Sequence, residues 1–340
     1  MSDNGDIRPA NADGVPPKKN GSHIAELLLR LRHAAERLPV SRTSQEDVKL
    51  LSQTLRELRR AFTVFAPYRT QRKVTIFGSA RTPRDAPAYE QAERFSKSMA
   101  ENGWFVVTGA ATGIMEAGHR GAGRDRSMGL NIMLPFEQEA NDVIRGDGKL
   151  VTMKYFFTRK LMFVKECDAV VCLPGGFGTM DEAFEVLTLL QTGKREMIPL
   201  VFLDGPGGQF WRDWLAYIRA NLLAGGMISP EDLSLFRVTD SVEETVAEIL
   251  GFYRVFHSME YVNNRLVLRL QQPLSEARLA SLEQSFADIL ADGHFRQEAA
   301  MNGQPTAADH GSLSRIILHF NRRSLGRLRQ LIDAINAEAA

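Results

Sequence analysis

The stretch DAVVCLPGGFGTMDE, residues 168–182, decides the fold of this chain. Residues 168–173 form a short, largely apolar run rich in β-branched side chains, which predicts a buried strand. Phe184, Leu187 and Leu190 follow at the spacing of a helix. The glycines between them therefore lie in a strand-to-helix turn, where close backbone N–H groups and a helix start can hold a phosphate.

Two carboxylates, Asp181 and Glu182, come directly after this glycine turn. One interpretation is a capping box, in which Glu182 bonds back to the N–H of Thr179 at the helix start. The other is that an acidic side chain serves a ligand held by the turn. The segment from Thr179 to Glu182 alone leaves both open, whereas the whole PGGxGTxxE string is more than capping requires and favours the second.

The composition is that of an ordinary globular protein: 340 residues, 44% hydrophobic and 24% charged, with a formal net charge of +1. This charge balance argues against binding of a nucleic acid polymer. Cys167 and Cys172 match no metal or redox spacing, so we expect small buried side chains in a reducing compartment. No apolar run could span a bilayer and residues 1–21 lack the apolar core of a signal peptide, so we expect a cytoplasmic protein with no membrane partner.

The sequence pattern predicts four parts along the chain. These are a disordered tail (1–22), an N-terminal helical segment (23–70), a Rossmann-like catalytic domain (71–254) and a small α+β domain (255–340). In the second part we expect helices over residues 23–38 and 44–66. In the last part we expect a βαβα unit, with strands at 265–270 and 314–320, helices at 275–290 and 324–336, and a loop at 293–311.

The third part alternates between apolar strands and helices. Its predicted strands are residues 73–78, 104–108, 127–134, 150–153, 168–173 and 198–203. Strands that are almost continuously apolar predict an α/β fold with a doubly wound parallel sheet, covered by helices on both faces. Ligands bind such sheets at the carboxyl ends of the strands. The small residues at Ser79, Gly109 to Gly113 and Gly175 to Thr179 therefore predict one ligand-binding rim.

Other ligand-binding motifs are absent from the sequence. Neither of the first two turns carries the GxGxxG fingerprint, and no glycine loop ends in GK[ST]. No cluster of His, Cys and carboxylates has the spacing of a metal site, and we expect His119 to be a packed or surface residue. What remains is the glycine turn, Glu182 beside it, and two cations nearby in sequence, Arg159 and Lys160. From its position alone, a charge on a helix surface is the simplest interpretation of Arg159.

The glycine turn resembles the PGGxGTxxE signature of the LONELY GUY (LOG) family, which are nucleotide 5′-monophosphate phosphoribohydrolases often labelled lysine decarboxylases. Arg159 and Lys160 match the Arg-Lys pair of that family, and Gly78-Ser79 matches its first-strand turn. Residues 109–116 resemble its GGGxxGxME segment, with Ala110 and Ala111 where the family usually has glycines. The resemblance covers about residues 73–252.

The resemblance implies a Rossmann-like fold, a homo-oligomer that is a dimer or larger, and no cofactor or metal. The implied reaction is hydrolysis of the N-glycosidic bond of AMP or a cytokinin riboside monophosphate, which gives a free base and ribose 5-phosphate. The implied catalytic residues are Glu182, which would stabilise charge on the ribose, and Arg159, which would orient the substrate or assist departure of the base. The implied substrate- and phosphate-binding residues are Ser79, Gly109, Gly113, Lys160, Gly175, Gly176, Gly178 and Thr179.

Two alternatives stay open at this point. A non-catalytic nucleotide-binding protein would keep the glycine turns without requiring Glu182. A decarboxylase dependent on pyridoxal phosphate needs a Schiff-base lysine, and no lysine is singled out by its sequence context.

Overall fold

The computed structural model describes residues 20–134, 139–299 and 313–337. The chain forms two compact units, residues 1–56 and 57–340. Helix α1 (Asn20–Arg37) lies in the first unit, and α2 (Gln45–Phe65) begins in it and ends in the second, which confirms the two predicted helices. Ser44 caps α2, because its Oγ accepts from the backbone N of Asp47 at 3.1 Å. Of the predicted disordered tail, residues 1–19 lie outside the described part of the chain.

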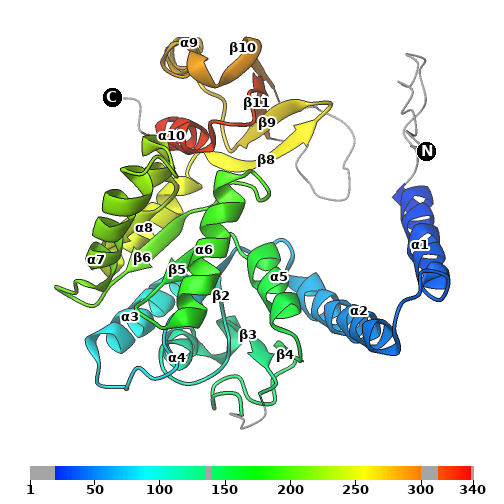
Figure 1. Ribbon diagram of the computed structural model, residues 1–340. Coiled ribbons are helices and arrows are strands. Elements are labelled where there is room, and N and C mark those ends of the chain that lie inside the picture. The colour runs from blue at the N-terminus through cyan, green and yellow to red at the C-terminus, as the bar shows by residue number, and fades with distance from the viewer. Residues whose placement is uncertain (1–19, 135–138, 300–312, 338–340) are drawn as a thin grey trace. The chain divides into compact units, whose positions relative to one another are not determined.

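The second unit contains a seven-stranded parallel sheet (Figure 1). Its strands are β1 (Lys73–Phe77), β2 (Phe105–Thr108), β3 (Ser127–Ile132), β4 (Leu150–Met153), β5 (Ala169–Cys172), β6 (Leu200–Leu203) and β7 (Arg237–Thr239). The strand order is β4-β3-β2-β1-β5-β6-β7. The chain therefore builds outward from β1 in one direction and then, from β5, in the other. This confirms the doubly wound α/β fold and places its switch point between β1 and β5.

Helices cover both faces of this sheet because its side chains alternate between two apolar clusters. In β1, Val74 and Ile76 pack in one cluster, while Phe77 packs in the other. The first cluster includes residues of α3 (Pro87–Glu101), α4 (Ile114–Arg126) and α8 (Val242–Phe252). The second includes residues of α5 (Phe156–Glu166), α6 (Phe177–Gln191) and α7 (Phe210–Tyr217). Both cysteines are buried and free, as the sequence predicts.

The C-terminal part forms a second, antiparallel sheet in the order β10-β11-β9-β8. Its elements are β8 (Phe256–Val262), β9 (Arg265–Leu270), α9 (Glu276–Ser285), β10 (Leu290–Glu298), β11 (Ser314–Phe320) and α10 (Leu325–Asn336). The predicted βαβα order is therefore wrong, because it lacks two strands, β8 and β10. The observed order is ββαββα. Of the two predicted central strands, β11 alternates between buried and half-buried residues and β9 buries four of its six residues. In contrast, β10 buries only Phe295 and is an edge strand.

Because β10 is a strand, the helix predicted before it and the loop predicted over it have different bounds in the structure. The helix expected over residues 275–290 ends at Ser285, because a short 3₁₀ turn (Ala287–Ile289) leads into β10. The loop expected over residues 293–311 begins as strand up to Glu298, and residues 300–312 lie outside the described part.

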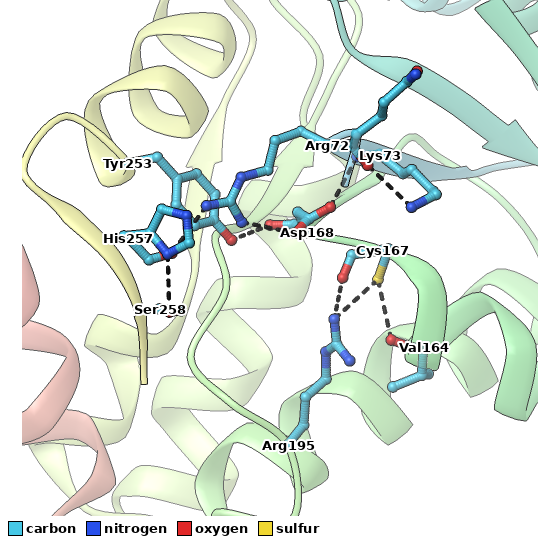
Figure 2. A network of polar contacts seen from close by, with 10 residues as sticks. Arg72, Lys73, Val164, Cys167, Asp168, Arg195, Tyr253, His257 and Ser258 are labelled. Atoms are coloured by element: carbon cyan, nitrogen blue, oxygen red, sulfur yellow. Dashed lines mark hydrogen bonds and ion pairs between the residues drawn. The ribbon is translucent and has the colours of Figure 1, made fainter. Parts of the chain in front are cut away.

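A polar network at the amino edge of the parallel sheet joins it to β8 (Figure 2). Arg72 donates to Asp168 Oδ1 at 2.7 Å and to the carbonyl of His257 at 2.9 Å. The Arg72 guanidinium lies 3.8 Å from the ring centroid of Tyr253, whose hydroxyl donates to the carbonyl of Asp168 at 2.6 Å. Asp168 Oδ2 also accepts from the backbone N of Lys73 at 2.9 Å. Asp168 and Arg72 thus connect the starts of β1, β5 and β8.

Candidate functional site

A cavity of about 790 Å³ opens at the carboxyl edge of the parallel sheet, at its switch point. The turns after β1, β2 and β5 all contribute to its wall, which confirms that the three predicted turns share one rim. Eight of the ten predicted site residues line it: Ser79, Gly109, Arg159, Gly175, Gly176, Gly178, Thr179 and Glu182. The volume lies in the range typical of small-molecule sites.

The three glycines of the turn after β5 serve two different purposes. A Cβ on Gly175 would lie 2.2 Å from Thr179 Oγ1 and 3.0 Å from the backbone N of Ser79, so only glycine lets these groups close together. Gly176 and Gly178 would direct a Cβ into open space, which leaves their backbone accessible. No side chain caps the start of α6, so its first N–H groups remain available to an anion.

The capping-box interpretation of Glu182 is wrong. Helix α6 begins at Phe177 with Gly176 as its N-cap, so Thr179 and Glu182 both lie inside the helix. The sequence misplaces the helix start because Gly176 and Phe177 read as loop residues, whereas an exposed helix start tolerates glycine. The Glu182 carboxyl is therefore not held at the start of its own helix.

Glu182 combines burial with an unsatisfied oxygen. The residue is 6% exposed and lines the cavity, and its Oε2 has no hydrogen-bond partner among the described residues. Burial raises the pKa of Glu182 from its ordinary value of 4.5 to about 7, although the positive charges of Lys160 and Arg159 act in the opposite direction. A carboxyl poised near neutral pH in a cavity is a candidate catalytic group.

Arg159 lines the same cavity from α5. Its Nε is buried and, like Glu182 Oε2, has no hydrogen-bond partner in the described part of the chain. The guanidinium lies 5.1 Å from the ring centroid of Phe156 and 5.6 Å from that of Phe163, within cation–π range of both. Burial lowers the pKa of Arg159, and the charge of Glu182 opposes this. The cavity thus holds two opposite charges that each keep an unsatisfied atom.

The remaining two predicted site residues lie beside the cavity and not in its wall. Lys160 Nζ is 2.6 Å from Asp181 Oδ2 and 3.0 Å from Glu185 Oε2, so its charge is occupied by two carboxylates. Gly113 has a φ of +64°, and a Cβ there would lie 2.3 Å from the carbonyl oxygen of Ser79. Gly113 therefore packs the first two turns of the rim against each other.

Among the other residues that line the cavity are Arg81, Met115, Asn131 and Phe156, which the sequence did not single out as site residues. Asn131 carried a usable signal, since it is a polar residue near the carboxyl end of an otherwise apolar strand. Arg81 follows the first-strand turn directly. The apolar pair, Met115 and Phe156, gave no signal because apolar helix residues usually pack in a core.

Among the described residues that line this cavity there is no lysine. Elsewhere in the described part of the chain, no three His, Cys, Asp or Glu side chains come together as a metal site would require. No described helix has the length and apolar character needed to cross a membrane.

The fold and the cavity define a doubly wound α/β protein with a ligand site at the switch point of its sheet. Residues 108–249 match the family model described as "Possible lysine decarboxylase". This match and the relatives below confirm that the chain resembles the LONELY GUY family.

Two relatives carry the name cytokinin riboside 5′-monophosphate phosphoribohydrolase. The protein of Mycobacterium tuberculosis is 29% identical over 49% of this chain and 88% of its own length. The protein of Rhodococcoides fascians is 29% identical over 56% of this chain and 95% of its own length. Among solved structures, the molybdenum cofactor binding protein of Rippkaea orientalis is 18% identical, with a TM-score of 0.38 over 53% of this chain and 96% of that chain.

Proposed function

We propose that this protein hydrolyses the N-glycosidic bond of nucleoside 5′-monophosphates and releases a free base and ribose 5-phosphate. The observation that carries the proposal is the buried carboxyl of Glu182, unpaired at Oε2, in the same cavity as an uncapped, glycine-rich helix start. The names of the relatives at 29% identity support the same reaction.

The start of α6 is the proposed phosphate site. Gly176 and Gly178 leave the backbone open to the cavity, and the dipole of α6 favours negative charge at this end. Ser79 and Thr179 line the cavity beside them and supply hydroxyl groups. Phosphate binding at this point would use remote binding energy to position the sugar for reaction.

Glu182 is the proposed catalytic carboxylate. As the bond between C1′ of the ribose and the base nitrogen breaks, its electron pair leaves with the base and positive charge develops on the sugar. The ionised Glu182 would stabilise that charge and orient the water whose oxygen bonds to C1′. The water gives up one proton and the departing base gains one, so the reaction is balanced. The pKa of Glu182, raised by burial to about 7, suits a group that also accepts a proton from water.

Arg159 and the apolar wall are assigned to the rest of the substrate. Arg159 would orient the substrate or assist departure of the base, since its Nε is unsatisfied in the cavity. Met115, Phe156 and Phe210 line the cavity and offer apolar surface to a flat base. AMP is the simplest substrate of this class, and an adenine with an apolar N6 substituent, as in a cytokinin, would bury more surface.

The proposed assembly is a homo-oligomer. At the cavity, Phe177 is 96% exposed and Phe156 is 57% exposed. Large apolar side chains at a rim suit coverage by another copy of the chain. Light scattering at several protein concentrations would test this, and a monomer throughout would contradict it.

The decarboxylase alternative has less support than the hydrolase. It requires a lysine that can form a Schiff base, and the described part of the cavity wall contains none. A non-catalytic binding protein has no need for an unpaired buried carboxyl, which is costly to keep.

One assay separates these three functions. The protein is incubated with a panel of nucleoside 5′-monophosphates, and free base and ribose 5-phosphate are quantified. We expect both products in equal amounts from AMP or an N6-substituted AMP. Binding without products would favour the non-catalytic alternative, and amine formation from lysine with pyridoxal phosphate would favour the decarboxylase.

A further inference from the structure

Ala110 occupies a backbone conformation that alanine rarely adopts. Its φ is +60°, in the left-handed region, where the Cβ of an L-residue is crowded. Five non-glycine residues in the described part of the chain have a positive φ, and Ala110 is the only one of them that is buried. Such a conformation persists only where the surrounding structure holds it.

Three hydrogen bonds hold the backbone around Ala110. Two of them involve the side chains of Thr108 and Asn141, and the third involves the backbone N–H of Asn141. Ala110 N donates to Thr108 Oγ1 at 3.0 Å. The carbonyl of Ala110 accepts from the backbone N of Asn141 at 2.8 Å, and the carbonyl of Ala111 accepts from Asn141 Nδ2 at 3.0 Å. Thr108 and Asn141 together therefore fix both sides of the left-handed residue.

His119 connects Thr108 to Asn141. It is fully buried, and its Nε2 lies 3.0 Å from the carbonyl oxygen of Met128 and 3.0 Å from Thr108 Oγ1. A carbonyl only accepts, so Nε2 carries the proton and Nδ1 accepts from Asn141 Nδ2 at 3.1 Å. The neutral imidazole thus orders both residues that hold the turn.

This turn forms the part of the cavity wall next to Arg159. Gly109 and Ala111 line the cavity, whereas His119 does not. A Cβ placed on Gly109 would lie 3.7 Å from Arg159 Nη1, so a shift of the turn would change the space available to that guanidinium. The methyl group of Ala110 faces the other way, into a small apolar cluster with Ala140 and Ile144.

We propose that His119 is a positioning residue, which acts through Thr108 and Asn141 to hold the strained turn at Ala110 and so keeps the wall beside Arg159 in place for the substrate. The inference rests on the proposed function for its substrate, a nucleoside 5′-monophosphate. If it is correct, replacing His119 should impair activity only while residue 110 carries a Cβ, since glycine adopts a positive φ without strain.

The test measures kcat and KM for AMP in His119→Leu, in Ala110→Gly and in the double variant. We expect His119→Leu to lower kcat/KM about tenfold, mainly through KM, because an unsupported turn samples other conformations. Adding Ala110→Gly should restore kcat/KM to within about threefold of Ala110→Gly alone. The matched control is Ala111→Gly, since Ala111 has no positive φ and glycine there relieves no strain.

The outcomes separate the inference from the proposed function. If Ala110→Gly does not restore kcat/KM, or Ala111→Gly restores it equally, His119 has only a general structural role and the inference is wrong. If His119→Leu does not fold, Thr108→Val replaces it, because it removes the hydroxyl that accepts from Ala110 and keeps the shape. If the wild type does not hydrolyse AMP, the proposed function fails, and the Kd of AMP in the same variants decides the inference; no AMP binding by the wild type overturns both.

Discussion

At the amino edge of the parallel sheet, Arg72 and Asp168 form an ion pair at 2.7 Å, and the Asp168 carboxylate also accepts from the backbone of Lys73. At the carboxyl edge, Glu182 and Arg159 line one cavity, yet each keeps a buried atom without a hydrogen-bond partner in the described part of the chain. The Arg72–Asp168 pair therefore differs from Glu182 and Arg159 in how its polar atoms are satisfied.

The difference holds for these two pairs of side chains and not for every charge at the amino edge, where Arg195 Nε is also buried without a hydrogen-bond partner in the described part of the chain. A cavity of about 500 Å³ also opens at the amino edge, but Arg72 and Asp168 in its wall are paired and join β1, β5 and β8 (Figure 2). Leaving a buried polar group unpaired costs about 1–3 kcal/mol, so a fold that leaves two such groups in one cavity loses stability there. That loss is consistent with a site arranged for a substrate.

The largest expected effect is on stability, at the carboxyl edge. Burial raises the pKa of Glu182 to about 7 in the folded state, from an ordinary value of 4.5. The folded chain therefore binds this proton more tightly than the unfolded chain, and the wild type should lose stability as pH rises from about 4.5 to about 7. We expect Glu182→Gln to be more stable than the wild type at pH 8 by up to about 3 kcal/mol. This is the free energy that corresponds to the shift in the pKa of Glu182.

Urea unfolding of both proteins at pH 4.5 and pH 8 measures this difference. The stability advantage of Glu182→Gln should be small at the lower pH and full at the higher one. A wild type that is the more stable protein at pH 8 would show that the Glu182 carboxylate is satisfied in the folded state, as the Asp168 carboxylate is.

The second effect is on the reaction. Glu182→Gln should lower kcat for release of adenine from AMP by about 100-fold, or about 2.7 kcal/mol of barrier, because the amide cannot stabilise positive charge on the sugar. Glu185→Gln is the matched control on the same helix, since Glu185 does not line the cavity, and should stay within about twofold. Equal rates for Glu182→Gln and the wild type would remove Glu182 from the chemistry.

The third effect is at the amino edge. Asp168→Ala leaves Arg72 and the backbone N–H of Lys73 without their carboxylate partner, which should cost about 2 kcal/mol of stability in urea unfolding. Activity per folded molecule should not change, because this network lies at the opposite end of the strands. A loss of kcat in fully folded Asp168→Ala would mean that the two edges are coupled.

The smallest effect concerns Lys160. Because its ammonium already contacts Asp181 and Glu185, Lys160→Met should change KM for AMP by less than about threefold. Its charge does lower the pKa of Glu182 against the effect of burial, so the pH at which kcat/KM is half-maximal should rise in this variant. A KM increase of tenfold or more would restore Lys160 as a phosphate ligand.

Sequence pattern predicts the parallel sheet well because each strand is a short apolar run that ends in a small-residue turn. It fails at the edge strands β7, β8 and β10, because these three bury few of their side chains. The three turns of the rim could be predicted because glycines mark close backbone approach. The pairing of Lys160 with Asp181 could not, because residues 21 positions apart meet only through the packing of α5 against α6.

The central claim is that the backbone at the start of α6 holds the phosphate, while Glu182 is reserved for the sugar. The most direct test is calorimetric titration of inorganic phosphate, which carries no sugar, into the wild type and Glu182→Gln at pH 8. We predict an equal or lower Kd for Glu182→Gln, because removing the carboxylate removes repulsion of the phosphate. A Kd raised about tenfold or more, some 1.4 kcal/mol, would contradict the account, since Glu182 would then be holding the ligand itself.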